Sequence, residues 1–138
     1  MTKTGYSIVI PYYNRPELLL RVVNSVLAQT FQDFEIIVID DASSIPVPPL
    51  PQNVHLIRRT ANGGGAAARN DGIRAASGRY IAFLDSDDYW LPDRLATANS
   101  FITGSRLGPS VIFFSDVLVK KRQGVKVVYR NRLSAHAS

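Results

Sequence analysis

Along the chain, short apolar runs alternate with segments in which apolar residues recur at helical spacing. Five such runs predict strands, at residues 7–10, 34–39, 54–58, 80–84 and 111–114. Few polar residues interrupt the second run, as expected of a strand that is covered on both faces. This alternation is typical of βαβ units, so we expect an α/β, Rossmann-like fold with a mostly parallel sheet flanked by helices.

The first predicted helix follows the first strand and carries apolar residues on one face between residues 18 and 27. Asn14 is placed to cap it, and Pro16 suits its first turn. Glu17 sits where a capping box would have its acidic residue. We therefore expect this helix to begin at about Pro16.

Two more helices and a terminal hairpin complete the predicted elements. One helix opens at the glycine run 63–65 and continues to Ala76, with Gly78 in the position of a C-terminal cap. Another begins at Pro92. The partly polar alternation at residues 117–129 predicts a C-terminal β-hairpin near an edge of the structure. A proline-rich stretch at residues 41–52 predicts a loop.

Length and composition limit the class of protein. A chain of 138 residues with 46% hydrophobic and 20% charged residues is expected to form one globular domain. It has no cysteine and no run near the about 18 apolar residues that span a bilayer, so we expect a soluble protein without disulfides. The net charge of +5 comes largely from the last twenty-odd residues, where a solvated strand face explains it, and no nucleic-acid partner is expected.

The fourth apolar run ends in three carboxylates within four residues, Asp85, Asp87 and Asp88. Like charges at about 4 Å repel by roughly 1 to 4 kcal/mol per pair, depending on the local dielectric, and a cation would offset this cost. Carboxylate oxygens suit Mg²⁺ or Mn²⁺, which commonly bring phosphate oxygens with them. The segment therefore predicts a metal–diphosphate site, although Asp88 could instead cap the helical region that follows.

Polar residues also follow the first two predicted strands, at residues 11–15 and at Asp40 and Asp41. Ligands of an open parallel sheet bind beyond the carboxyl ends of its strands, so these segments and the acidic cluster should meet in one crevice. One of the two aspartates is expected to cap a turn. A carboxylate can equally accept the N3–H of a uracil ring.

The glycine run at residues 63–65 would let the backbone approach a ligand closely, ahead of the free N–H groups of a helix. Arg69 lies about one turn into that helix and could reach a phosphate. A tight loop with solvent-facing glycines explains the run equally well. The spacing is not that of a dinucleotide fingerprint, and no P-loop lysine follows.

Taken together, the motifs in this region form an ordered set. They are Ile10-Pro11-Tyr12-Tyr13-Asn14, Gln29-Thr30-Phe31, Glu35-Ile36-Ile37-Val38-Ile39-Asp40-Asp41-Ala42-Ser43, Asn62-Gly63-Gly64, Ala68-Arg69-Asn70-Asp71-Gly72 and Phe83-Leu84-Asp85-Ser86-Asp87-Asp88. In order and spacing, over about residues 5 to 104, they resemble glycosyltransferase family 2.

The resemblance implies a GT-A fold, a nucleotide-sugar donor (most often a UDP-sugar) and a divalent cation, Mn²⁺ or Mg²⁺. It implies that Pro11 and Tyr13 flank the base and that Asp41 hydrogen-bonds it. Arg69 would lie near the base or diphosphate. The nucleotide-binding candidates are Pro11, Tyr13, Arg15, Asp41, Gly64, Arg69, Asp85 and Ser86, and the metal candidates are Asp85 and Asp87, with Asp87 the direct ligand.

The resemblance also implies an inverting mechanism. Its general base, an Asp or Glu, would come from a later segment beside the acceptor site. We match no such residue in this sequence, so the catalytic residue is unassigned. The resemblance implies a single GT-A-type domain over residues 1–138 that binds the donor and lacks the acceptor half. Such a chain would belong to an inverting glycosyltransferase of polysaccharide biosynthesis and be inactive alone. The alternative is a non-catalytic, metal-dependent nucleotide-binding module.

Further expectations concern partners and location. The acceptor hydroxyl would belong to a saccharide, a lipid-linked saccharide or a protein. An exposed edge of the hairpin at residues 117–129 could pair with a second copy of the chain and form a homodimer. We expect a cytoplasmic protein, with peripheral association at the inner face of the membrane as a further option.

Overall fold

A computed structural model describes residues 4–104, 111–113, 118–121, 124–127 and 135–137. The chain divides into two compact units, Met1–Leu95 and Ala96–Ser138, and each is described by itself. All of the predicted site residues belong to the first unit. The prediction of a single donor-binding domain without an acceptor half stays a prediction.

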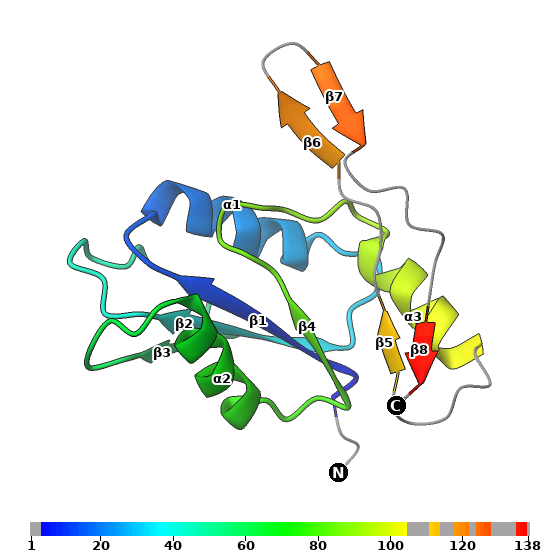
Figure 1. The fold of residues 1–138 in the computed structure, drawn as a ribbon, viewed down its shortest axis with the longest axis horizontal. Coiled ribbons are helices and arrows are strands. Elements are labelled where there is room, and N and C mark those ends of the chain that lie inside the picture. The colour runs from blue at the N-terminus through cyan, green and yellow to red at the C-terminus, as the bar shows by residue number, and fades with distance from the viewer. Residues whose placement is uncertain (1–3, 105–110, 114–117, 122–123, 128–134, 138) are drawn as a thin grey trace. The chain divides into compact units, whose positions relative to one another are not determined.

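The first unit is built on a four-stranded sheet (Figure 1). Its strands are β1 (Tyr6–Tyr12), β2 (Phe34–Asp40), β3 (Val54–Arg58) and β4 (Tyr80–Phe83). They lie in the order β3-β2-β1-β4, and every pairing is parallel. All seven residues of β1 are buried. The predicted parallel sheet is confirmed, and its carboxyl ends face one side of the unit.

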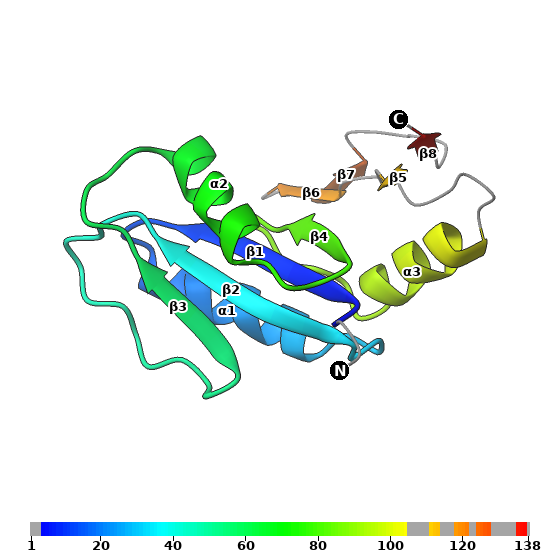
Figure 2. The ribbon, with the colours of Figure 1, turned by 90° about the horizontal axis from the view of Figure 1, so that it is seen from below.

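Helices α1 (Pro16–Leu27) and α2 (Gly65–Ala75) lie on opposite faces of this sheet, as Figure 2 shows. The apolar face of α1 buries Leu19, Val22, Val23 and Val26. On the other face, Ala68 of α2 belongs to a buried cluster with residues of β1 and β2. The central strands β1 and β2 are thus covered on both sides, which explains their almost uninterrupted apolar sequences, whereas β3 and β4 are more exposed.

Helix α3 (Arg94–Gly104) begins two residues after the predicted start at Pro92 and crosses the boundary between the units. Its first turn is tied to the first unit, because the backbone N–H of Leu95 donates to Gln29 Oε1 at 2.9 Å. Among the described residues, no helix is both long enough and apolar enough to cross a membrane.

The second unit contains two described pairs of antiparallel strands. Strands β6 (Leu118–Lys121) and β7 (Gly124–Val127) pair where the hairpin is predicted, and residues 122–123 between them lie outside the described residues. Strand β5 (Val111–Phe113) matches the fifth predicted strand. It pairs with β8 (Ala135–Ala137), which the apolar pattern does not predict.

The predicted capping of α1 is wrong. Arg15, not Asn14, is the N-cap residue, and no side-chain hydrogen bond caps the helix, so the capping box with Glu17 does not form. Asn14 has a φ of 52°, and its Oδ1 accepts the backbone N–H groups of Ser44 and Ile45, each at 2.9 Å. Its side chain therefore holds the loop after β2 against the end of β1.

The predicted cap at Gly78 is also wrong, because α2 ends earlier, with Ala76 as its C-cap in an extended conformation. Gly78 is needed for a different reason. Its N–H donates to Ser7 Oγ at 2.8 Å, and an added Cβ would lie only 2.5 Å from the backbone nitrogen of Ser7. The residue lets the chain pass close to β1 as it enters β4.

Candidate functional site

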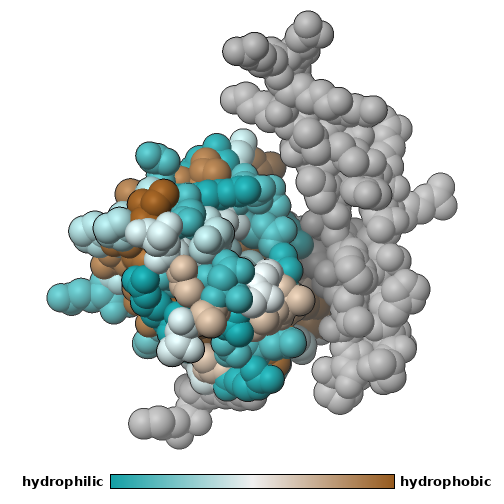
Figure 3. Space-filling model, turned by 60° about the vertical axis from the view of Figure 1, so that its left-hand side comes forward, coloured by the Kyte–Doolittle hydropathy of each residue, from teal (hydrophilic) through white to brown (hydrophobic). Residues whose placement is uncertain are grey.

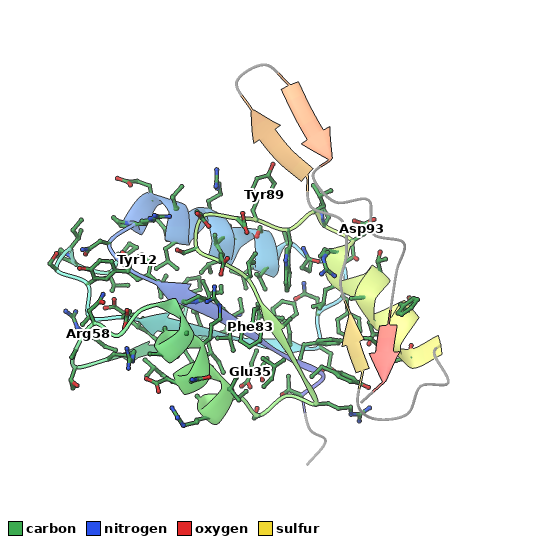
Figure 4. All side chains as sticks on the ribbon, in the orientation of Figure 1. Tyr12, Glu35, Arg58, Phe83, Tyr89 and Asp93 are labelled. Atoms are coloured by element: carbon green, nitrogen blue, oxygen red, sulfur yellow. The ribbon has the colours of Figure 1, made fainter. Side chains whose placement is uncertain are left out.

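A break in strand pairing opens the sheet beside Pro11. The pairing of β1 with β4 ends at Val9 and Phe83, whereas β1 continues along β2 as far as Tyr12. Alternate residues of a strand bond to alternate neighbours, so the nitrogen of Pro11 faces the side of β4. Since proline has no N–H, the strand loses no hydrogen bond where β4 is missing. In Figure 4 the labelled Tyr12 marks this end of β1.

A cleft of about 290 Å³ lies at the carboxyl ends of β1, β2 and β4. Figure 3 shows the molecule with the left-hand side of Figure 1 brought forward, where hydrophilic and hydrophobic residues are interspersed. Four separate segments of the chain contribute to the wall of the cleft, as expected for a ligand site of a parallel sheet. The lining residues are Pro11, Tyr12, Tyr13, Arg15, Asp41, Gly65, Ala68, Asp85, Ser86 and Asp87.

Of the two adjacent aspartates, Asp40 stabilises the fold locally. Its side chain is fully buried, and Oδ1 accepts the backbone N–H of Ser43 at 3.0 Å. Its Oδ2 lies 3.7 Å from Arg58 Nη1, and Figure 4 shows Arg58 at the end of β3. Asp40 does not line the cleft, so it matches the aspartate that was expected to cap a turn.

Asp41 faces the cleft and is held by three donors. Its Oδ1 accepts Arg59 Nη1 at 2.5 Å and the N–H of Gly63 at 3.0 Å. Its Oδ2 accepts the N–H of Gly64 at 2.8 Å. Burial by itself would raise the pKa of Asp41, but these donors and the charge of Arg59 outweigh burial and lower the pKa. Asp41 is therefore an ionised, acceptor-only group in the wall of the cleft.

The acidic cluster forms at the other side of the cleft, directly after β4. The N–H of Asp88 donates to the backbone oxygen of Asp85 at 3.0 Å, closing a turn that gathers the three carboxylates. Three arginines from other segments meet this turn, and one of them, Arg21, donates from Nη2 to the backbone oxygen of Asp87 at 3.0 Å. Arg69 Nη2 lies 2.5 Å from Asp85 Oδ1, and Arg15 Nη1 lies 3.2 Å from Asp87 Oδ2.

The cluster has the chemistry of a divalent-cation site. One oxygen from each of Asp85, Asp87 and Asp88 lies within 4.8 Å of the others. Burial, followed by the charges of Asp87 and Asp85, raises the pKa of Asp88 and outweighs the opposing charge of Arg21. Few, hard oxygen ligands at an exposed site suit Mg²⁺ or Mn²⁺, which keep positions for water and phosphate. The residues therefore fit the implied cation.

The structure brings the sequence-predicted residues together with two exceptions. Those in the wall of the cleft are Pro11, Tyr13, Arg15, Asp41, Asp85, Ser86 and Asp87. Gly64 and Arg69 do not line it. They contact residues that do, because Gly64 bonds to Asp41 and Arg69 pairs with Asp85.

Some residues of the site were not predicted. Tyr12 and Ala68 line the cleft but were not candidates, whereas Gly65, which also lines it, belongs to the glycine run that was expected to approach a ligand. Arg59 is the more important omission, since it is the charged partner of Asp41. A signal for it existed: Arg59 follows a predicted strand directly, at the same edge of the sheet as Asp41, and an arginine there can reach a neighbouring carboxylate.

Comparison with known proteins agrees with this fold. Residues 7–106 match the family described as Glycosyl transferase family 2. The succinoglycan biosynthesis protein ExoW of Rhizobium meliloti (strain 1021) is 42% identical over 107 residues, covering 70% of this chain and 34% of ExoW.

Solved structures show the same architecture. S. aureus TarS 1-349 in complex with UDP-GlcNAc is 29% identical with a TM-score of 0.64, covering 72% of this chain and 31% of that one. The mannosyltransferase PcManGT from Pyrobaculum calidifontis, in complex with GDP-Man and Mn²⁺, is 25% identical with a TM-score of 0.61 over 72% of this chain and 32% of that one. The chain spans about a third of the length of each of these three proteins. The expected GT-A fold is confirmed, and the chain belongs to glycosyl transferase family 2.

Proposed function

We propose that this chain is the donor-binding part of an inverting glycosyltransferase that moves a sugar from a nucleotide-sugar, in particular a UDP-sugar, to an acceptor hydroxyl. The observation that supports this most is that one cleft is lined both by an ionised acceptor, Asp41, and by two carboxylates of the acidic cluster, Asp85 and Asp87. The nucleotide part of a nucleotide-sugar has a base at one end and, at the other, a diphosphate that can bind a metal ion. The complex of TarS with UDP-GlcNAc supports the same class of ligand.

In this proposal the base lies between Pro11 and Tyr13 and donates its imino N–H to Asp41. Tyr13 is 46% exposed, so its ring is available to stack. Gly65 lines the cleft at the start of α2, where backbone N–H groups of a helix are free to meet a phosphate. The base would thus be bound by side chains at or just beyond the carboxyl ends of β1 and β2, and the diphosphate by the start of α2 and the turn after β4.

Asp85 and Asp87 would hold the divalent cation, with Arg15 and Arg69 beside them. Mn²⁺ or Mg²⁺ bound there supplies charge neutralisation for the departing nucleotide diphosphate. The two ion pairs of these arginines are exposed and of little energetic weight, so each guanidinium can turn from its carboxylate to a phosphate at small cost.

A second candidate function is a metal-dependent nucleotide-binding module without catalysis. One observation favours it. Among the described residues that line the cleft, the carboxylates are Asp41, assigned to the nucleobase, and Asp85 and Asp87, assigned to the cation, so none is left to act as the general base. Donor turnover by a longer protein that contains this segment would favour the enzyme. For either function we propose a cytoplasmic location, at the inner face of the membrane if the acceptor is lipid-linked.

Calorimetric titration of UDP in the presence of Mn²⁺ tests the proposal. Asp87→Ala should weaken binding by about tenfold or more, equivalent to about 1.4 kcal/mol, because a cation ligand is lost. Asp93→Ala is the matched control, since Asp93 is also an exposed aspartate but lies outside the cleft, as Figure 4 shows. Equal affinities of the two variants would refute the assignment of the metal site.

A further inference from the structure

Arg59 reaches Asp41 from outside the cleft. It follows β3 directly, and its backbone N–H donates to the backbone oxygen of Asp40 at 2.8 Å. Its side chain is only 20% exposed and is not part of the cleft wall. Arg59 therefore contacts Asp41, which lines the cleft, but does not line the cleft itself.

The guanidinium of Arg59 is fixed at both ends of its planar fork. Nη1 bonds to Asp41 Oδ1 at 2.5 Å, and Nε bonds to Asp71 Oδ2 at 2.7 Å. Asp71 lies in α2 and is held in turn by Arg74 Nη1 at 2.8 Å from its other oxygen. This chain of ion pairs connects the end of β2 with α2 and leaves Arg59 little freedom to turn away.

The glycine run makes room for this arrangement. An added Cβ at Gly63 would lie 2.5 Å from Arg59 Nη1, so a side chain there would displace the guanidinium. The same glycine donates its N–H to Asp41 Oδ1. The absence of a side chain at Gly63 thus serves Arg59 and Asp41 together.

The hydrogen bonds of Asp41 leave it little capacity for a ligand. A carboxylate offers about four acceptor positions, two on each oxygen. Arg59 and Gly63 fill both positions on Oδ1, and Gly64 fills one on Oδ2. One acceptor position remains, on Oδ2.

The nucleobases differ in how many donors they present to such a group. Uracil presents a single N–H between two carbonyl oxygens. Guanine presents two donors side by side, the ring N–H and the exocyclic amino group, and needs both oxygens of a carboxylate. Cytosine presents an unprotonated ring nitrogen, which a carboxylate repels.

We propose that Arg59 is a specificity-determining, positioning residue: by occupying and fixing Oδ1 of Asp41, it restricts that carboxylate to one N–H donor and so selects uracil over guanine. This inference rests on the proposed function, because it assumes that Asp41 faces the base. It names a residue outside the cleft as the origin of base selectivity, and Asp71 as its anchor.

The test compares the affinities of UDP and GDP, each titrated with Mn²⁺ into the wild-type chain and its variants. Wild type should prefer UDP by at least about tenfold. Arg59→Met keeps the aliphatic stem but removes the donors, which frees Oδ1 and should reduce the UDP/GDP ratio by about tenfold. Arg59→Lys, with one compact donor, should retain an intermediate ratio. A general loss of structure would weaken both nucleotides and leave the ratio unchanged.

Two other variants keep the test decisive. Arg58→Met is the matched control: Arg58 is the preceding arginine, pairs with Asp40 and does not line the cleft, so the ratio should not change. Asp71→Asn weakens the anchor of Arg59 without touching Asp41 and should lower the ratio even if Arg59→Met does not fold. The role of Arg59 would be refuted, and the proposed function left standing, by either of two results. One is a wild-type UDP/GDP ratio in both Arg59→Met and Asp71→Asn, and the other is equal binding of UDP and GDP by wild type. Binding of neither nucleotide by wild type would overturn the proposed function as well.

Discussion

Replacing Gly64 by alanine should destabilise the fold through the backbone alone. Gly64 has φ 88° and ψ 169°, a region that only glycine adopts readily, and it directs its N–H to Asp41 Oδ2. Nothing lies within 4 Å of the position that an added Cβ would take, so no clash contributes. The cost is then the conformational strain, about 1–3 kcal/mol.

The matched control is the next residue. Gly65 is the first residue of α2 and has no positive φ, so Gly65→Ala should be neutral or stabilising by up to about 1 kcal/mol. Its new methyl group would meet only Arg69 Nη1, at 3.1 Å, the flexible end of a side chain that is 36% exposed. Two adjacent Gly→Ala changes are thus predicted to have opposite or clearly different effects.

Urea unfolding, followed by circular dichroism, measures the free energy of unfolding of both variants and of wild type. If Gly64→Ala changes the free energy of unfolding by less than about 0.5 kcal/mol, the range of an ordinary surface substitution, the argument from backbone strain is refuted. A loss for Gly65→Ala as large as that for Gly64→Ala would also refute it. Either result would mean that the local conformation at the start of α2 is not the one described.

Two further outcomes follow from packing and charge. Gly72→Ala should cost about 1–3 kcal/mol in unfolding free energy, because its Cβ would lie 2.3 Å from Val9 Cγ1, and a second change, Val9→Ala, should recover part of the loss. The lowered pKa of Asp41 means that its stabilising contribution is complete above its ordinary pKa of about 4 and is lost as the pH falls through the lower value in the folded state. In urea unfolding between pH 7 and pH 3, the difference in stability between wild type and Asp41→Asn should therefore be constant at neutral pH and shrink in acid; a difference that grows in acid would contradict the sign.

Much of the fold was predictable because local signals agree with the tertiary structure. Apolar runs such as residues 34–39 specify strands that are buried on both faces, and the alternation with helices specifies parallel pairing. The end of β4 was recognisable because three carboxylates within four residues follow an apolar run, although β4 itself is only half-buried to exposed. Seven of the residues predicted from these signals and from the family resemblance line one cleft in the structure.

What the sequence did not predict depends on contacts between distant residues. Asn14 has the residue type of a helix cap, yet its side chain bonds to a loop 30 residues away, because the end of β1 passes beside the end of β2. Gly78 resembles a helix stop, but the close approach of β1 requires it. The pairing of Arg59 with Asp41 and Asp71 joins three elements. Local pattern alone cannot reveal such partners.

The central claim is that the cleft beside Asp41 and the acidic cluster binds a nucleotide diphosphate through a divalent cation. Its most direct test is the affinity of the wild-type chain for UDP, measured by calorimetry with Mn²⁺ and again with excess EDTA. The account predicts saturable binding with one site in Mn²⁺ and an affinity at least about tenfold lower in EDTA. No binding, or binding of equal strength in the two buffers, would contradict it.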